Sequence, residues 1–296
     1  MPLLKKVIIP VAGLGTRMLP ATKAIPKEML PVVNKPIIQY IVEEVLYAGF
    51  EEIILVTHSS KSSIENHFDK SFKLESTLEK RVKRGMLKEL RDISKLKIPM
   101  KSIIQVEAKG LGHAIICAKK EIGKDPFAIV LPDMLISKKN GNSGDSLKEM
   151  KSNFEKHEIS SVLLGKAKKE DVSKYGIAQI KRNSLLSGLG MIEKIIEKPS
   201  MNKAPSNLYA VGRYIFNNNF FRYLSKVKPD KSNEIQLTDA IDDYIKDKNK
   251  VSAFSIDGEV FDCGDNAEYI LANLEFAMKD PSLKTKIKNY VKTRLF

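Results

Sequence analysis

Short runs of consecutive apolar residues alternate with helical patterns through the first half of the chain. Between the first two runs, residues 34–49 place their apolar side chains on one face at helical spacing, and Ala114–Ile122 is also helix-like. Continuous apolar strands that alternate with helices predict an α/β fold, in which helices cover both faces of a mainly parallel sheet. The runs that we interpret as strands are Val7–Val11, Ile53–Val56, Ile103–Val106 and Phe127–Leu131.

The second half of the chain has a more mixed pattern. A helix is predicted near Ile235–Lys246 and another over 265–278, followed by a basic helical tail. Without an internal repeat or a flexible linker, the chain is expected to form one domain over residues 1–296. The Lys- and Ser-rich stretches 70–101 and 138–153 are expected to be surface insertions. The strands predicted here are Ser161–Gly165, Ile177–Ile180, Gly190–Glu197, Leu208–Phe216 and Val251–Ile256.

The composition limits the class of protein but does not identify its function. Hydrophobic residues make up 43% of the 296 residues and charged residues 29%, which is typical of a globular protein. No apolar run approaches the roughly 18 residues of a membrane span, and the first apolar stretch is too short for a signal peptide. We therefore expect a cytoplasmic protein without membrane association. Cys117 and Cys263 lack metal-binding spacing and are expected to be free thiols.

The net charge of +14 is concentrated in two segments. Residues 70–101 contain 11 Lys and Arg against 4 Asp and Glu, and residues 284–294 contain 5 basic residues and no acid. Such an excess is compatible with nucleic acid, an anionic surface or a polyanionic small molecule. Phe72 is the only aromatic residue of the first segment, so the stacked-aromatic patterns of RNA binding are absent. We interpret both segments as solvated basic helical faces and expect no nucleic-acid partner.

A glycine-rich turn follows the first predicted strand. Gly13-Leu14-Gly15-Thr16-Arg17 would present backbone N–H groups to phosphates, because no Cβ blocks their approach. Met18 occupies the position of the third small residue of a dinucleotide-binding fingerprint, and no P-loop lysine motif is present. Instead, Arg17 and Lys27 provide cations on both sides of the turn, where they could stabilise charge during transfer at a nucleotide phosphate.

The turn belongs to a longer set of matching segments. They are Ala12–Pro20, Thr22-Lys23, Pro26–Pro31, Lys35–Tyr40, Gln105–Ala114, Leu131–Asp133, Tyr175-Gly176, Glu197–Pro199, Asn233–Ala240 and Phe261–Gly264. Together they resemble the sugar-1-phosphate nucleotidylyltransferases over nearly the whole chain, and the segment around Pro26–Pro31 resembles the uridylyl-transferring branch. The resemblance implies a Rossmann-like nucleotidyltransferase fold, with a nucleotide-binding half (1–135), a sugar-phosphate-binding half (136–264) and C-terminal helices (265–296).

The resemblance also assigns a nucleotide site. An amide side chain such as that of Gln105 can donate and accept hydrogen bonds, as reading a uracil edge requires. We expect His113 to be a packing or capping residue and not a catalytic base. Arg17, Lys27 and Lys198 are the implied catalytic cations. The implied nucleotide-binding residues are Ala12, Gly13, Gly15, Thr16, Glu28, Gln105, Gly110 and Gly112.

Two carboxylates and a second set of residues complete the expected site. Asp133 follows the strand Phe127–Leu131, and ligands of open α/β sheets gather at such strand ends. Since Mg²⁺ prefers carboxylate and phosphate oxygens and water, Asp133 is a candidate metal ligand, and Asp262 is a second one that acts directly or through water. By resemblance, the sugar-phosphate-binding residues are Gly176, Glu197, Lys198, Val211 and Gly212.

The reaction implied by the resemblance is Mg²⁺-assisted transfer of a uridylyl group from UTP to glucose 1-phosphate, giving UDP-glucose and pyrophosphate. The attacking phosphate oxygen is already anionic, so no general base is expected. One alternative is a relative that uses dTTP or another nucleotide or sugar phosphate, and a more distant one is a non-catalytic nucleotide or nucleic-acid binder. Members of the family usually oligomerise, which implies a homodimer or homotetramer.

Overall fold

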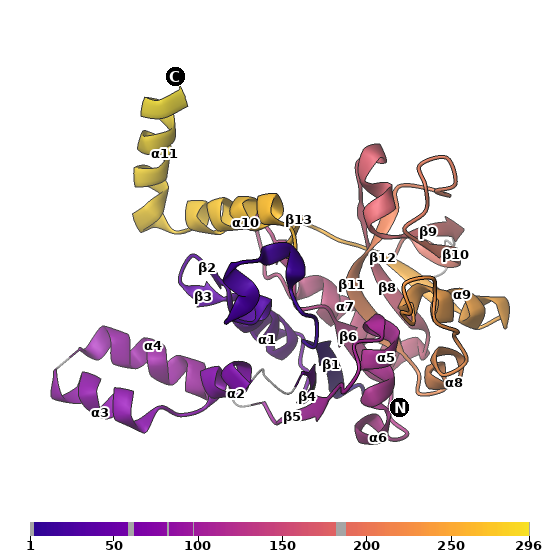
Figure 1. Cartoon of the computed structure of the whole chain (residues 1–296), viewed down its shortest axis with the longest axis horizontal. Helices are drawn as coiled ribbons and strands as arrows, with labels where there is room; N and C mark the ends of the chain where they lie inside the picture. The colour runs from indigo at the N-terminus through magenta and orange to yellow at the C-terminus, as the bar shows by residue number, and fades with distance from the viewer. Residues whose placement is uncertain (1–2, 59–61, 82, 97, 182–187, 296) are drawn as a thin grey trace.

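A nine-stranded sheet forms the centre of the molecule. A computed structural model describes residues 3–58, 62–81, 83–96, 98–181 and 188–295 (Figure 1). The strands lie in the order β5-β4-β1-β6-β11-β8-β12-β10-β9. Their bounds are β1 (Lys6–Pro10), β4 (Glu52–Thr57), β5 (Met100–Ile104), β6 (Phe127–Val130), β8 (Ser160–Lys166), β9 (Gly176–Lys181), β10 (Gly190–Glu197), β11 (Leu208–Phe216) and β12 (Val251–Ser255).

The sheet is mixed, and its parallel part carries the first half of the chain. β5, β4, β1 and β6 are parallel neighbours, as the apolar runs predicted. β11 then pairs antiparallel with both β6 and β8, while β8 and β12 are again parallel. The carboxyl ends of β1 and β6 therefore lie next to each other, which is where an α/β sheet places its ligands.

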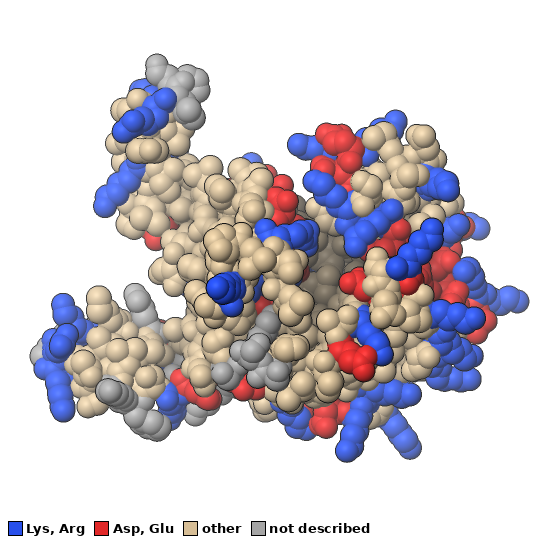
Figure 2. All heavy atoms as spheres, in the orientation of Figure 1, with Lys and Arg blue, Asp and Glu red and all other residues tan. Residues whose placement is uncertain are grey.

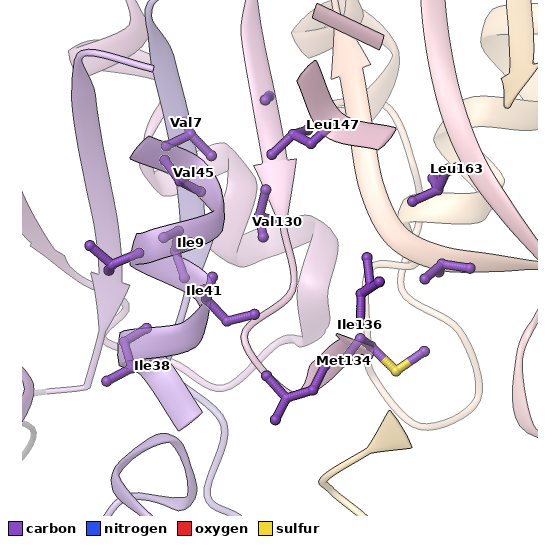
Figure 3. Packing of buried hydrophobic residues seen from close by; sticks show 14 of the residues in the cluster. Val7, Ile9, Ile38, Ile41, Val45, Val130, Met134, Ile136, Leu147 and Leu163 are labelled. Atoms are coloured by element: carbon purple, nitrogen blue, oxygen red, sulfur yellow. The ribbon is translucent and has the colours of Figure 1, made fainter. Parts of the chain in front are cut away.

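Helices cover both faces of this sheet, as expected. Val7 and Ile9 of β1 face one hydrophobic core, and Ile8 between them faces the other. Figure 3 shows Val7 and Ile9 packing towards Ile41 and Val45 of the first helix. Burial of each such side chain contributes roughly 1.5–3 kcal/mol. The covering helices are α1 (Ile37–Tyr47) and α7 (Asp145–His157) on the first face, and α5 (Gly110–Cys117), α6 (Lys119–Ile122), α8 (Phe220–Leu224) and α9 (Leu237–Lys246) on the second.

Two small sheets and three short 3₁₀ helices complete the region near the first core. The pair of β7 with β13 brings residues 134 and 262 opposite each other, which matters for the site below. The bounds are β2 (Pro31–Val32), β3 (Lys35–Pro36), β7 (Met134–Ser137), β13 (Glu259–Asp262), η1 (Thr16–Met18), η2 (Ala21–Lys23) and η3 (Lys27–Met29), and a further 3₁₀ helix, η4, spans Lys169–Lys174.

Two helical segments project from the body of the molecule (Figure 1). α3 (Phe72–Lys80) and α4 (Arg84–Lys95) form a hairpin beyond α2 (Ser62–Phe68), as expected of a surface insertion at 70–101. α10 (Asn266–Lys279) lies along the body, and α11 (Pro281–Leu295) extends away from it. No helix in the described parts of the chain is long and apolar enough to cross a membrane.

Two expectations about individual elements need correction, and one about the cysteines is confirmed. The stretch 138–153 is not a surface insertion, because α7 buries Leu147, Met150 and Phe154 in the first core. The helix expected at 114–122 begins earlier, at Gly110, and is divided into α5 and α6. Cys117 and Cys263 are free thiols, as predicted.

Candidate active site

Two adjoining cavities lie at the carboxyl ends of β1 and β6. The smaller has a volume of about 480 Å³ and the larger about 780 Å³. Both are lined mainly by residues from the segments that the sequence singled out. Because they meet at a charged wall, two ligands could touch each other there. The residues shared by the two linings are Arg17, Leu111, Leu131 and Asp133.

The glycine turn forms one wall of the smaller cavity. Gly13 leaves room beside Lys27, whose Nζ would lie 3.9 Å from a Cβ at that position. Gly15 has a φ of 65°, and a Cβ there would lie 3.2–3.3 Å from Thr22 and Lys27, so this glycine packs the turn from behind. The predicted nucleotide residues that line the cavity are Ala12, Gly13, Thr16, Gln105 and Gly110, whereas Gly15, Glu28 and Gly112 lie behind its lining.

The opposite wall is the start of α5, which is joined to the segment before α9. The N–H of Gly112 donates to the carbonyl of Ile235 (2.8 Å), and the N–H of Ile235 donates to that of Lys109 (2.9 Å). A Cβ on Gly112 would lie 2.7 Å from the Ile235 carbonyl oxygen. Gly112 is therefore required by this backbone contact. The same backbone contact brings Glu234 into the cavity lining, a residue that was not predicted to belong to the site.

Gln105 and His113 contact each other at the edge of this wall. The Gln105 side chain is buried, and its Nε2 lies 2.9 Å from Nδ1 of His113 and 3.3 Å from the carbonyl oxygen of Gly110. His113 thus contacts a predicted base-reading side chain and does not line the cavity itself. Its expected structural role agrees with this position.

The two candidate metal ligands lie on neighbouring strands. Asp133 precedes β7 and Asp262 ends β13, and the N–H of Cys263 donates to the Asp133 carbonyl (2.8 Å). A Cβ on Gly264 would lie 3.0 Å from Asp262 Oδ1, 3.1 Å from Arg17 Nη2 and 3.4 Å from Asp133 Oδ2. These three side chains therefore converge around Gly264, which belongs to the matching segment Phe261–Gly264 but was assigned no role from the sequence.

Lys27 forms an ion pair with Asp133, with Nζ 2.5 Å from Oδ2. Burial raises the pKa of the Asp133 carboxyl, but the charge and hydrogen bond of Lys27 outweigh it and lower that pKa below its usual value. Burial lowers the pKa of Lys27, but the negative charges of Asp133 and Glu28 outweigh it and raise that pKa. Both groups are therefore charged at neutral pH. Burial and the neighbouring Asp133 raise the pKa of Asp262.

The chemistry of this donor set fits a divalent magnesium ion. In the described parts of the chain, no group of three or more His, Cys, Asp or Glu side chains could hold a metal by itself. Mg²⁺ is usually held by one or two carboxylates together with substrate phosphates and water. Asp133 and Asp262 beside two cavities lined in part by Lys and Arg side chains match that pattern, whereas an all-protein calcium or zinc cage would not.

The larger cavity is lined by three of the residues expected to bind the sugar phosphate, Gly176, Glu197 and Lys198. Glu197 Oε2 accepts a hydrogen bond from Thr238 Oγ1 (3.0 Å), and a Cβ on Gly176 would lie 2.6 Å from the Thr238 methyl group. Gly176 therefore makes room for the side chain that holds Glu197. The N–H of Lys198 donates to the Tyr175 carbonyl (3.0 Å), which fixes the start of that side chain.

Two of the expected sugar-phosphate residues lie away from the cavity wall. Val211 is fully buried in the first core, and Ala210 lines the larger cavity in its place. Gly212 has a φ of 77°, and a Cβ there would lie 2.8 Å from Leu131. A glycine is therefore needed at this position so that β11 can approach Leu131, which lies two residues before Asp133.

A buried ion pair behind the site was not predicted. Arg213 Nε and Nη2 donate to the two carboxylate oxygens of Glu44 on α1 (2.9 and 2.6 Å). Nη1 also lies 3.4 Å from the Leu131 carbonyl oxygen. Since a buried ion pair is often no more stable than an apolar pair, its geometry is the more informative feature: it joins α1, β11 and the chain leading to Asp133. The sequence shows an Arg within an apolar strand but does not indicate which residue it contacts.

This fold and paired-cavity site are those of a nucleotidyl transferase. The chain belongs to the nucleotidyl transferase family, whose model matches residues 6–279. It is 47% identical to a UTP–glucose-1-phosphate uridylyltransferase of Haemophilus ducreyi, over 97% of this chain and 98% of the relative.

Solved structures agree with that classification. A UTP-bound UGPase from Acinetobacter baumannii is 40% identical, with a TM-score of 0.87 over 97% of this chain and 98% of its own. A UDP-glucose pyrophosphorylase complexed with UDP-glucose is 41% identical, with a TM-score of 0.83 over 94% of this chain and 100% of its own. The α/β nucleotidyltransferase fold expected from the sequence is thereby confirmed.

Proposed function

We propose that this chain transfers the uridylyl group of UTP to glucose 1-phosphate, releasing UDP-glucose and pyrophosphate. The observation that carries the proposal is the junction of two cavities at Asp133 and Arg17, with Lys27 paired to Asp133. The names of the relatives, and the UTP and UDP-glucose in the titles of similar structures, support this choice of substrates.

UTP occupies the smaller cavity in this proposal. Its base lies against Gln105 and Gly110, and its phosphates lie along the glycine turn between Gly13 and Arg17. Glycine N–H groups and the guanidinium of Arg17 would hold the phosphate oxygens. Lys27, whose raised pKa keeps it protonated, provides a second cation at the same end of the cavity.

Glucose 1-phosphate occupies the larger cavity. Glu197 would accept hydrogen bonds from sugar hydroxyls, and the exposed ammonium group of Lys198 would bind the phosphate. Lys198 Nζ lies 3.4 Å from Glu197 Oε1, so the two side chains approach the same region of the cavity.

The reaction is an in-line displacement at the α-phosphorus of UTP. An oxygen of the sugar phosphate forms the new P–O bond, and the bond to the β-phosphate oxygen breaks, so that pyrophosphate leaves on the opposite side. Arg17, Lys27 and Lys198 position the two phosphates and stabilise the negative charge that develops. We propose Mg²⁺ as the metal; held by Asp133 and Asp262, it would neutralise charge on the phosphate oxygens.

Pyrophosphate release tests this function against its alternatives. With glucose 1-phosphate and Mg²⁺ present, UTP should be used far better than dTTP, CTP or ATP. A clear preference for dTTP would favour the related thymidylyl transfer. Nucleotide binding without pyrophosphate release from any of the four would favour a non-catalytic binder.

We also propose that the chain works as a single domain, with residues 1–135 holding the nucleotide, 136–264 the sugar phosphate and 265–296 adding the C-terminal helices. The division is supported by the two cavities, whose walls come mostly from the first and second segments respectively. A homodimer or homotetramer remains the expected assembly, and sedimentation velocity would measure it.

A further inference from the structure

The contact between Gln105 and His113 has a consequence for nucleotide selection. We propose that His113 is a positioning residue that fixes the orientation of the Gln105 amide, so that its oxygen faces the base and selects uracil over cytosine. This inference rests on the proposed function, because it concerns the base of the nucleotide in the smaller cavity. It adds a role for a side chain that lies outside the lining of that cavity.

A main-chain hydrogen bond and burial determine where Gln105 lies. Its main-chain N–H donates to the carbonyl of Thr57 at the end of β4 (2.8 Å). The residue is only 4% exposed, yet it lines the smaller cavity together with Gly110 and Ala12. For a side chain buried in this place, a half-turn of the terminal amide exchanges the oxygen and the nitrogen.

The carbonyl oxygen of Gly110 and Nδ1 of His113 together favour one of these two orientations. A carbonyl oxygen can only accept a hydrogen bond, so the amide atom that lies 3.3 Å from it must be the nitrogen. The same nitrogen lies 2.9 Å from Nδ1 of His113. Two acceptors thus engage the two hydrogens of the amide, and Oε1 is left as the group that can bind a ligand.

This arrangement also specifies the tautomer of His113. Nδ1 accepts from Gln105, so it carries no proton, and the proton of the neutral ring is on Nε2. The ring is held in place by α5, in which the neighbouring Ala114 and Ile115 are buried in the second core. Gly112 is tied to Ile235 on the other side.

An amide oxygen in this position distinguishes the bases by their hydrogen-bonding edges. Uracil has an N3–H that can donate to Oε1 of Gln105. Cytosine has an unprotonated N3 at the same place, and two acceptors facing each other in a partly buried site are unfavourable. Thymine has the same edge as uracil, so this device separates UTP from CTP and does not separate UTP from dTTP.

Substitutions of His113 test the proposal. His113→Leu removes the nearer of the two acceptors and leaves only the longer contact with the Gly110 carbonyl (3.3 Å), so the Gln105 amide can turn its nitrogen towards the base more easily. We expect the ratio of kcat/KM for UTP to that for CTP to fall by about 10-fold or more, the scale of one unsatisfied buried hydrogen-bonding group. The KM for glucose 1-phosphate should stay within about twofold. His113→Asn keeps an acceptor close to the position of Nδ1 and should restore most of the ratio.

Cys117→Ala is the matched control, because it alters α5 one turn further along without touching Gln105. It should leave the UTP-to-CTP ratio unchanged. If His113→Leu and Cys117→Ala gave the wild-type ratio, the proposed role of His113 would be wrong even though uridylyl transfer itself was intact. A wild-type protein that did not use UTP would instead contradict the proposed function.

The tautomer provides a test that does not depend on activity or on the folding of a variant. In protein labelled with ¹⁵N-histidine at neutral pH, His113 should show an unprotonated Nδ1 and a protonated Nε2, and its signals are assigned by their loss in His113→Asn. A protonated Nδ1 would contradict the proposal, because that nitrogen could not accept from Gln105.

Discussion

Three charged side chains define the site at the scale of single residues. Arg17 and Asp133 line both cavities, and Lys27, which lines the smaller one, forms an ion pair with Asp133. In the proposed reaction, this arrangement would place positive charge on the nucleotide side of the junction and a carboxylate between the ligands. Charge stabilisation by positioned groups is therefore the main catalytic effect that the site can provide.

The first prediction concerns Arg17. Replacing it with Ala should reduce kcat by about 10²-fold or more, because a positioned donor to the developing phosphate charge is lost. Its guanidinium makes no ion pair that supports the fold in the described residues, so the midpoint of urea unfolding should stay close to that of the wild type. Lys23→Ala, an exposed cation outside both cavities, is the control and should keep full activity.

Individual site residues were predictable where a strand end preceded them. The turn after β1 and the Asp133 after β6 follow continuous apolar runs, so their place at one edge of the sheet followed from the pattern. Gly264 and Arg213 could not be found in this way. Their roles depend on contacts with residues far away in the chain, such as Glu44, that no local pattern shows.

At the scale of elements, β11 connects the site to the core. Its pairing with β8 shifts register between Ala210 and Tyr214, and Gly212 lies in this irregular stretch with a φ of 77°. A β-bulge typically re-aims nearby side chains. Here Gly212 lets the strand approach Leu131, and Arg213 reaches the carbonyl of that residue.

The second prediction compares two glycines with similar backbone geometry. Gly49→Ala introduces a Cβ at a φ of 82° with no atom within 4 Å, so its cost is backbone strain of roughly 1–3 kcal/mol. Gly212→Ala adds a clash with Leu131, which should lower the free energy of unfolding by about a further 1–3 kcal/mol. It should also lower kcat, because Leu131 leads to Asp133. Urea unfolding and steady-state kinetics measure both effects, and equal losses in the two variants would contradict this account.

The third prediction concerns the contact of α2 with α1. His67 Nε2 lies 3.0 Å from Gln39 Oε1, and burial lowers the pKa of His67. The unfolded chain therefore binds a proton more readily than the folded one, so stability should fall as pH decreases through the ordinary histidine value near 6.5. The free energy of unfolding should drop between pH 7.5 and 5.5, and drop less in His67→Gln. The same drop in both proteins would show that His67 is not responsible.

Most strands were predictable because they are continuous apolar runs, whereas α7 was not. Its sequence is rich in Lys and Ser, and its apolar residues Leu147, Met150 and Phe154 are spaced on a narrow helical face. The charged residues dominated the pattern, so the segment looked like surface. Only its packing against the sheet shows that this face belongs to the core.

At the scale of the whole molecule, the order of the strands in the sheet could not be predicted from the sequence. β11 comes late in the chain but lies between β6 and β8, antiparallel to both. Local patterns identify a strand but not the strands that pair with it. The expected parallel pairing therefore holds for β5, β4, β1 and β6 but not for β11. β11 also joins the two halves of the sheet, and its Ala210 and Tyr214 line the larger cavity.

The fourth prediction concerns the net charge of +14. Figure 2 shows Lys and Arg spread over much of the visible face, with Asp and Glu among them, and the projecting helices carry many of the basic residues. Because acidic residues lie among the basic ones, the charge should give only weak, salt-sensitive attraction to polyanions. We expect no detectable binding of a labelled oligonucleotide at about 150 mM salt by fluorescence anisotropy. Tight binding that weakens steeply with salt would instead favour a nucleic-acid partner.

The central claim is that two substrates react at the junction of the two cavities. The most direct test is to follow both products from UTP and labelled glucose 1-phosphate in the presence of Mg²⁺. We predict equal amounts of labelled UDP-glucose and pyrophosphate, and neither product when one substrate is omitted. Pyrophosphate formed without glucose 1-phosphate, or no UDP-glucose from the complete mixture, would contradict the account.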